Sequence, residues 1–288
     1  MSLELRQPKD DIATATGRIR AAQHPLDAML FHPLAERLAR LLSKTPVSPN
    51  MVSFAGGLAI VIAAIAYLQQ AWPWSALLGF AIHSLWHVLD GADGDLARMT
   101  GKASPSGEIF DGICDYSGHI LLYLMLAYAA SPALGWSALG LALAAGASRI
   151  VQANFYETQK RQYLDWVHGV AWLRTKPCES IESKQSTLGQ AYLKLADYLV
   201  PRDAVLEQAL SEPGKAGPLK QRLTQFGPQA LYGSDLLGAP YRTIALALSM
   251  LAGSPVWYFL FEIIILNMVL WTSIRRTRRT LADLAQAH

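Results

Sequence analysis

The sequence has little charge and little cysteine. Only 16% of its 288 residues are Asp, Glu, Lys or Arg, and 52% are hydrophobic, whereas soluble domains carry about 25% charged residues. This composition excludes disorder as the overall state, because disordered chains have few apolar residues. Two cysteines cannot staple a chain of this length, so a disulfide scaffold is excluded as well. A net charge of +3 is too small to indicate a nucleic-acid partner.

The first residues, MSLELRQPKDD, are charged and lack the apolar core that a secretory signal peptide needs. We therefore expect membrane insertion to come from segments inside the chain. Apolar residues gather there in runs, and a spanning helix needs about 20 residues. The six runs, several of them completed by their polar flanks, are residues 51–68, 73–88, 113–130, 133–151, 243–252 and 255–273.

These runs predict an all-α fold, an integral membrane bundle of about six transmembrane helices. The run 243–252 is short and begins beside Arg242, which leaves five spans and a re-entrant turn as the alternative. Charge favours six spans, because none of the 25 Lys and Arg residues lies in the connections 69–74, 131–136 and 253–256. Basic residues stay on the cytoplasmic side, so both termini are predicted to be cytoplasmic.

A basic, amphipathic segment precedes the first run. In residues 25–44, leucines recur at helical spacing among basic residues, and Pro33 favours the start of a helix. We predict a helix that lies on anionic headgroups; a packing helix of a small cytosolic cap is the alternative. The residues of the pattern are Leu30, Leu34, Leu38, Leu41, Leu42, Arg37, Arg40 and Lys44.

The predicted organisation has three parts: a cytosolic segment at 1–50, a membrane domain at 51–274 and a basic cytosolic tail at 275–288. The membrane domain includes a polar stretch, 153–239, with a short amphipathic helix expected at 188–200. We interpret this stretch as a cytosolic insertion that covers the membrane-embedded site, with a mobile loop as the alternative. The prolines expected to interrupt it are Pro177, Pro201, Pro213, Pro218 and Pro228.

Four aspartates lie where two apolar runs meet the cytoplasmic side. Asp90 and Asp93 are three residues apart, and Asp111 and Asp115 are four apart, so each pair shares a helix face. Helices joined by a short loop are usually neighbours, which brings the pairs together. Carboxylates at this depth are costly unless they are paired or bound to metal, and oxygen ligands suit Mg²⁺ or Mn²⁺. We predict a divalent-cation site; a carboxylate–arginine network that ties the helix ends together is the alternative.

The residues between the two pairs fit phosphate chemistry. Gly91 and Gly94 let backbone approach a ligand closely, and Arg98 offers a planar donor fork. Lys102 and Ser104 add a charge and a hydroxyl. Cations that neutralise phosphates, beside a carboxylate that deprotonates a nucleophile, are what phosphoryl transfer requires.

Residues 90–115 match D-x2-D-G-x2-A-R-x8-G-x3-D-x3-D at all eight fixed positions. This motif resembles the signature of the CDP-alcohol phosphotransferases, and the predicted spans and basic N-terminal helix resemble that family too. The resemblance implies that Asp90, Asp93 and Asp111 bind two divalent ions, Mg²⁺ or Mn²⁺, and that Asp115 contributes and acts as general base. It also implies a set of donor contacts: Gly94, Ala97, Arg98, Ser104 (where many members have Thr), Gly107 and the turn Ser48, Pro49 and Asn50.

By this resemblance, an acceptor hydroxyl attacks the β-phosphate of a CDP-linked donor and CMP leaves. We expect a phospholipid-biosynthesis transferase, a homodimer in a bacterial inner membrane, with its site on the cytoplasmic side. The alanine-rich composition and modest length resemble a bacterial chain, and because CDP-diacylglycerol donors are commoner in bacterial members, the resemblance favours that donor. Residues 104–111, SPSGEIFD, are instead similar to choline and ethanolamine phosphotransferases, whose acceptor is a lipid. The acceptor alcohol stays open.

Three basic residues, Arg149, Lys160 and Arg161, are candidates for binding a phosphate on the acceptor, with ordinary positive-inside charge as an equal alternative. A divalent-cation transporter is a rival of another class, since acidic residues inside a bundle can mark an ion path. The lack of a matching polar line through the outer half of the spans argues against it. The intact motif argues against a catalytically silent scaffold.

Overall fold

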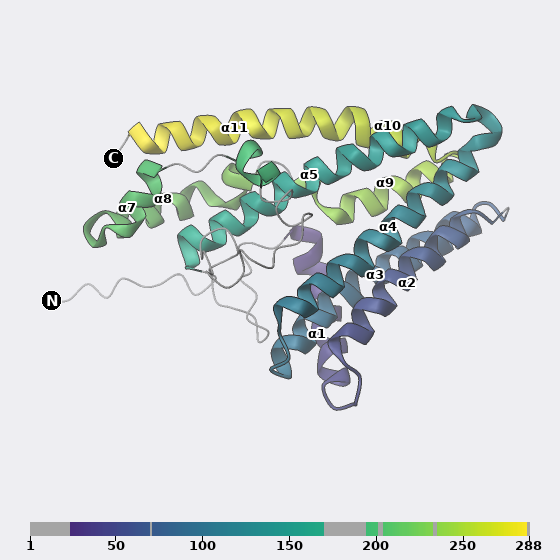
Figure 1. Cartoon of the computed structure of the whole chain (residues 1–288), viewed down its shortest axis with the longest axis horizontal. Coiled ribbons are helices and arrows are strands. Elements are labelled where there is room, and N and C mark those ends of the chain that lie inside the picture. Colours follow the sequence, from purple (N-terminus) through teal and green to yellow (C-terminus); the bar gives the residue numbers. More distant parts are fainter. Residues whose placement is uncertain (1–23, 70, 170–193, 201–203, 233–234, 287–288) are drawn as a thin grey trace. The chain divides into compact units, whose positions relative to one another are not determined.

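The computed structural model describes residues 24–69, 71–169, 194–200, 204–232 and 235–286, and their regular structure is entirely helical. The predicted all-α class is therefore confirmed. The elements (Figure 1) are η3 (Asp27–Phe31), α1 (His32–Leu42), α2 (Pro49–Tyr67), α3 (Trp74–Met99), α4 (Pro105–Leu134), α5 (Ser137–His168), α7 (Ala204–Ser211), α8 (Pro213–Tyr232), η4 (Asp235–Leu237), α9 (Ala239–Leu251), α10 (Val256–Leu260), η5 (Phe261–Ile265) and α11 (Leu266–Gln286).

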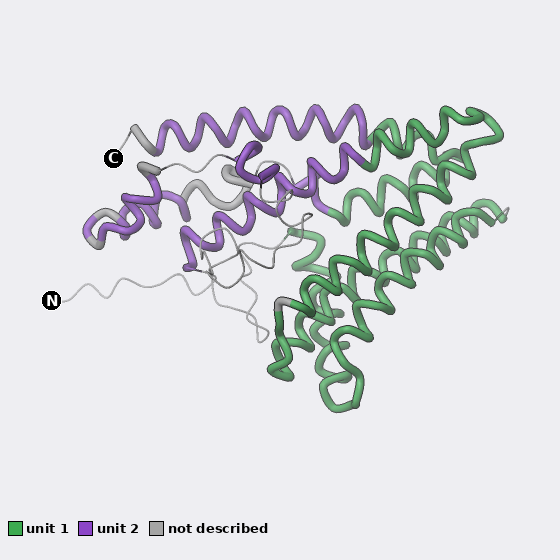
Figure 2. Tube along the Cα trace, viewed as in Figure 1, with its two compact units in different colours: residues 1–146, 239–261 green, residues 147–238, 262–288 purple. Residues whose placement is uncertain are grey.

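The chain forms two compact units (Figure 2). Unit 1 comprises residues 1–146 and 239–261, and unit 2 comprises 147–238 and 262–288. Unit 1 holds the first four α-helices with α9 and α10, whereas unit 2 holds most of α5 with α7, α8 and α11.

Among the described residues, three helical segments are long and apolar enough to cross a bilayer: Pro49–Tyr67, Ser106–Leu134 and Val256–Leu284. They overlap the first, third and last of the predicted apolar runs, and their length and composition fit the membrane insertion predicted from those runs. The count of six spans stays a prediction. One face of α2 is exposed although it is apolar, as a lipid-facing surface must be; its residues are Phe54, Leu58, Ile62 and Ile65.

Small residues let the helices of unit 1 approach closely. A Cβ added to Gly57 of α2 would lie 2.9 Å from the backbone oxygen of Cys114 on α4, and one added to Gly118 would lie 3.0 Å from the backbone oxygen of Gly57. Close backbone approach at glycine is the common way in which helices pack inside membranes. It places α2 directly against the start of α4, where two of the predicted site aspartates lie.

A helix, α1, lies within the segment predicted to form the N-terminal amphipathic helix, and Pro33 lies in its first turn. Its small side chains, Ala35 and Ala39, are buried in a cluster with Val52, Ala92 and Leu96. Leu38 and Leu42 pack against this cluster, whereas Leu34 and Leu41 of α1, and Leu30 of η3, are exposed. The exposed leucines beside the basic residues fit a surface that meets headgroups; a position on the membrane surface stays a prediction.

In unit 2, the prediction that Pro218 and Pro228 interrupt the polar stretch is wrong. Helix α8 continues across both Pro218 and Pro228. Each proline removes one backbone hydrogen bond, but α8 packs against α7 and α11, and this packing supports the helix. Of the helix predicted at 188–200, residues 194–199 are described and are helical; its beginning, like Pro177 and Pro201, lies outside the described residues.

Candidate metal and phosphate site

The turn between α3 and α4 fixes the relative position of the aspartates. Helix α3 ends in a Schellman motif, in which Gly101 adopts a φ of 67° and the Lys102 N–H donates to the Ala97 carbonyl at 2.9 Å. Helix α4 begins at Pro105, after five connecting residues, and Ser104 Oγ caps it by accepting the Gly107 N–H at 3.1 Å. This short connection makes the two helices neighbours, so the predicted juxtaposition of the two aspartate pairs has a local cause.

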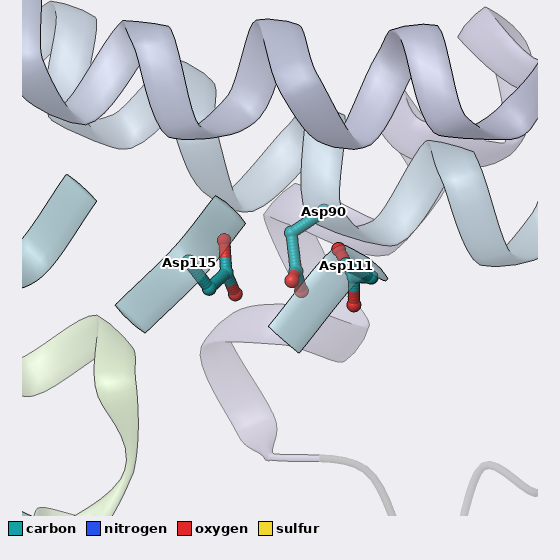
Figure 3. Close-up of side chains that lie close together, drawn as sticks. All are labelled: Asp90, Asp111 and Asp115. Atoms are coloured by element: carbon teal, nitrogen blue, oxygen red, sulfur yellow. The ribbon is translucent and has the colours of Figure 1, made fainter. Parts of the chain in front are cut away.

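Three of the four predicted metal ligands converge. Asp90 from α3 and Asp111 and Asp115 from α4 each offer a carboxylate oxygen, and these oxygens lie within 4.8 Å of one another. Figure 3 shows the three side chains pointing toward a common point. An arrangement of this size matches a cation that is coordinated by several carboxylates.

The fourth aspartate, Asp93, lies at the edge of this group. Ser53 on α2 donates its hydroxyl to Asp93 Oδ2 at 2.5 Å, and the carboxylate of Asp93 also lies close to that of Asp111. The sequence analysis missed Ser53. Nothing in its local sequence distinguishes it, because it belongs to a helix far away in the chain.

The oxygen set fits a divalent cation. One carboxylate oxygen of Asp111 is buried and, among the described residues, has no hydrogen-bond partner. A buried acceptor without a partner is costly, and a cation between the three carboxylates would satisfy it. Hard oxygen ligands of this kind suit Mg²⁺ or Mn²⁺. Asp90, Asp111 and Asp115, with Asp93 beside them, are therefore the residues that could hold the metal.

An arginine, Arg98, lies about one to two helical turns beyond Asp90 and Asp93 on α3. The guanidinium of Arg98 is 45% exposed and donates to Asp95 Oδ1 at 2.6 Å, whereas the carboxylate of Asp95 is fully buried. The buried partner holds the guanidinium while leaving it open to a ligand. A Cβ added to Gly94 would lie 3.4 Å from this guanidinium, so glycine leaves room for it. The (i, i+3) spacing of Asp95 and Arg98 is a signal that could have identified Asp95.

Apart from Ala97 on α3, the remaining predicted donor residues lie at two adjoining helix starts. Ser48 Oγ caps α2 by accepting the Met51 N–H at 3.3 Å, as Ser104 caps α4. A Cβ on Gly107 would lie 3.2 Å from Ser104 Oγ and 3.7 Å from Asn50 Oδ1, so the two helix N-termini adjoin. Helix N-termini favour bound phosphate. The structure thus brings Asn50 to Ser104 and Gly107; Ala97 is half-buried on α3.

A tryptophan that the sequence analysis did not select also contacts the aspartates. The indole N–H of Trp86 donates to Asp115 Oδ1 at 2.7 Å. Trp86 precedes Asp90 by four residues, so the two share one face of α3. The four-residue spacing from Asp90 is visible in the sequence. An aromatic residue on an apolar helix is ordinarily a core residue, however, so the spacing alone did not mark Trp86 as part of the site.

The three predicted acceptor-binding residues belong to unit 2, on the part of α5 beyond residue 146. The Nε of Arg161 lies 2.7 Å from Glu157 Oε1. Burial raises the pKa of Glu157, but Lys160 and Arg161 outweigh it, so its pKa falls below the usual value. Arg161 is thus already paired with a carboxylate.

Comparison with known proteins connects these features to a family. A family model described as CDP-alcohol phosphatidyltransferase matches residues 46–199, a range that includes all four aspartates and both helix starts. A phosphatidylinositol phosphate synthase of Cutibacterium acnes is 30% identical over 138 residues, which is 48% of this chain and 62% of that protein. An archaetidylinositol phosphate synthase of Aeropyrum pernix is 35% identical over 95 residues, or 32% and 47% of the two chains. The matched parts span less than two-thirds of either relative.

Proposed function

Because the chain belongs to the CDP-alcohol phosphatidyltransferase family, we propose that it transfers a phosphatidyl group from a CDP-linked donor to an alcohol and releases CMP. The observation that carries this proposal is the convergence of the Asp90, Asp111 and Asp115 carboxylates within 4.8 Å. The arginine and the two helix N-termini beside this cluster, with a cation held by the carboxylates, would stabilise the negative charge of a diphosphate. One of the carboxylates could remove a proton.

The donor is bound, in this proposal, by the groups around the carboxylates. Arg98, held by Asp95, offers a fork of N–H donors to the diphosphate, and the helix starts at Ser48 and Ser104 offer backbone N–H groups. A divalent ion held by the aspartates supplies positive charge that offsets the charge on the phosphates when it is bound. Asn50, Ala97 and Gly107 complete the surface proposed for the cytidine diphosphate.

Asp115 is the proposed general base. Its carboxylate takes the proton of the acceptor hydroxyl, and the acceptor oxygen then forms a bond to the β-phosphorus of the donor. The bond from that phosphorus to the oxygen bridging it to CMP breaks, and CMP carries the electron pair away. Carboxylates serve well as bases when they are positioned within hydrogen-bond reach of the hydroxyl.

The relatives' names suggest the acceptor. One is a phosphatidylinositol phosphate synthase and the other an archaetidylinositol phosphate synthase, so we place a phosphorylated inositol first, with CDP-diacylglycerol as donor. Such an acceptor carries a phosphate for which Arg149, Lys160 and Arg161 are the candidate partners. A homodimer in a bacterial inner membrane, with both termini and the site on the cytoplasmic side, completes the proposal.

Release of CMP by the purified full chain tests this function. The assay uses mixed micelles with Mn²⁺, three donors (CDP-diacylglycerol, CDP-choline and CDP-ethanolamine) and inositol phosphate, inositol, glycerol phosphate or diacylglycerol as acceptor. We expect release with CDP-diacylglycerol and inositol phosphate. Release with a CDP-aminoalcohol and diacylglycerol would make the lipid the nucleophile. No release from any pair would contradict transfer, and metal-ion uptake into vesicles would then favour the transporter.

A further inference from the structure

We propose that Trp86 is a positioning residue of this site, whose indole N–H holds the Asp115 carboxylate in the orientation in which it binds a divalent cation together with Asp90 and Asp111. This inference rests on the proposed function, because it gives the carboxylate cluster a cation to bind. It predicts that the tryptophan, which offers no oxygen ligand of its own, sets the affinity of the site for the metal.

The contact joins two helices at the centre of the site. The indole nitrogen on α3 lies 2.7 Å from Asp115 Oδ1 on α4, and Trp86 is only 5% exposed. An N–H that donates to a carboxylate makes a charge-assisted hydrogen bond, which is stronger than a bond between neutral groups. The indole N–H donates only. Trp86 can therefore orient Asp115, but it cannot itself remove the proton from a substrate.

The tryptophan ring is held in place on several sides. His119 meets it edge-on, with ring centroids 4.7 Å apart and an interplanar angle of 78°, and the ring of His87 lies 4.4 Å away. A Cβ added to Gly56 would be 3.5 Å from Trp86 Cδ1, which leaves the ring little free space on that side. The direction of the N–H is thus fixed by packing.

One of these neighbours, His119, also contacts the backbone at Asp115. His119 Nδ1 lies 2.8 Å from the Asp115 backbone oxygen, so the imidazole that packs against the tryptophan also contacts the turn that carries the carboxylate. Trp86, Asp90 and Asp93 follow one another at spacings of four and three residues on α3. The donor that orients Asp115 is therefore built on the helix that supplies the opposing ligand, and the two carboxylates are held relative to each other.

Removing the indole N–H should release the Asp115 carboxylate. Hydrogen bonds that orient metal ligands typically account for 10- to 100-fold in metal affinity or activity. We expect Trp86→Phe to weaken Mn²⁺ binding by about 10- to 100-fold, because the aromatic ring stays but the donor is lost. The effect should appear in binding even where no substrate is present, since it acts on the ligand and not on the transfer step.

The test measures Mn²⁺ binding by electron paramagnetic resonance on the full chain in detergent micelles, with no nucleotide. Trp166→Phe is the matched control, because Trp166 is a similarly buried tryptophan, 6% exposed, and belongs to unit 2. The thermal unfolding midpoint is recorded for each variant. A second variant replaces Trp86 by benzothienylalanine, in which sulfur takes the place of the N–H at nearly the same size, so that packing is kept if Trp86→Phe fails to fold.

The expected result is weaker Mn²⁺ binding in both Trp86 variants, with an unchanged control. Native Mn²⁺ affinity in the benzothienylalanine variant would overturn the inference, whatever the Trp86→Phe variant does. CMP release by the same proteins separates the two proposals. A wild-type chain that binds Mn²⁺ in a Trp86-dependent way but transfers nothing would contradict the proposed function and leave the positioning role intact.

Discussion

Both units bring polar side chains together between helices, but the side chains are neutral in one unit and charged in the other. In unit 2 the side chains are neutral and form hydrogen bonds with one another. Gln152 on α5 donates to Asn267 Oδ1 on α11 at 2.8 Å, and Asn267 donates to Ser148 Oγ at 3.0 Å. In unit 1 the groups are carboxylates that face one another, Asp90, Asp111 and Asp115. The neutral network joins helices, whereas the three carboxylates repel one another, so a bound cation would stabilise only the second arrangement.

Removing the metal should have the largest effect. We expect EDTA to abolish CMP release and Mg²⁺ or Mn²⁺ to restore it, because the carboxylates repel one another and the phosphates without a cation. The measurement is the initial rate of CMP release before and after chelation and back-titration. Unchanged activity in EDTA would contradict a role for a bound cation in the carboxylate cluster of unit 1.

Asp115→Asn should lower the rate nearly as much. The amide cannot take up the acceptor proton, and general base catalysis typically contributes about 10²- to 10⁴-fold. CMP release and donor binding are measured together, and donor binding should stay measurable. Asp283→Asn, an exposed carboxylate on α11, is the control. A variant at Asp115 that keeps its turnover would exclude this residue as the base.

Gly57→Ala tests the close helix contact that supports the carboxylates. The new Cβ would lie 2.9 Å from the Cys114 backbone oxygen, next to Asp115, so α2 and α4 must separate. Overpacking of this kind costs about 1–3 kcal/mol, which a lower thermal unfolding midpoint in detergent would report. Gly140→Ala on α5 is the matched control, because a Cβ there meets nothing within 4 Å; an equal loss in both variants would contradict the explanation.

Asn267→Leu tests the neutral network of unit 2. It removes the hydrogen bonds to Gln152 and Ser148, and such bonds between membrane helices contribute about 0.6–2 kcal/mol. We expect a modest fall in the unfolding midpoint with Mn²⁺ affinity unchanged. Met268→Leu, at an exposed neighbouring position, is the control. Loss of Mn²⁺ binding in the Asn267 variant would show that the neutral network is part of the metal site.

The features that could be predicted from the sequence are those that depend on residue type and local spacing. The all-α class, the start of α1 near Pro33 and the meeting of Asp90 with Asp111 and Asp115 follow from helical periodicity and one short turn. Among the described residues, three of the apolar runs likewise lie in helices long and apolar enough to cross a bilayer, because length and hydropathy are local properties.

The residues that it missed act through contacts between distant segments. Ser53 reaches Asp93 from another helix, and the role of Trp86 depends on the rotamer that places its N–H on Asp115. The continuity of α8 across Pro228 was also missed, because it depends on packing against α7 and α11 and not on propensity. Propensity is a weak guide where tertiary contacts support a helix.

The smallest expected effect is on stability and comes from Asp165, whose pKa is shifted in the opposite direction from that of Glu157 on the same helix. Glu157 has a lowered pKa beside Lys160 and Arg161, whereas burial and the nearby Glu207 raise the pKa of Asp165 despite Lys220. Below the ordinary pKa of an aspartate, about 3.9, both folded and unfolded states are protonated and the carboxyl has no effect. As the pH rises, the unfolded state loses this proton first, so ionisation lowers the stability of the fold.

Asp165→Asn removes this cost. We expect a slightly higher unfolding midpoint at pH 7 than in the wild type and equal midpoints at pH 3, because the difference exists only where the unfolded carboxyl is ionised. Thermal unfolding at both pH values checks the sign. A midpoint that falls at pH 7 would mean that Lys220, and not Glu207 with burial, dominates the surroundings of Asp165. The two carboxylates of α5 would then be alike, each dominated by nearby basic residues, in contrast to the three converging aspartates of unit 1.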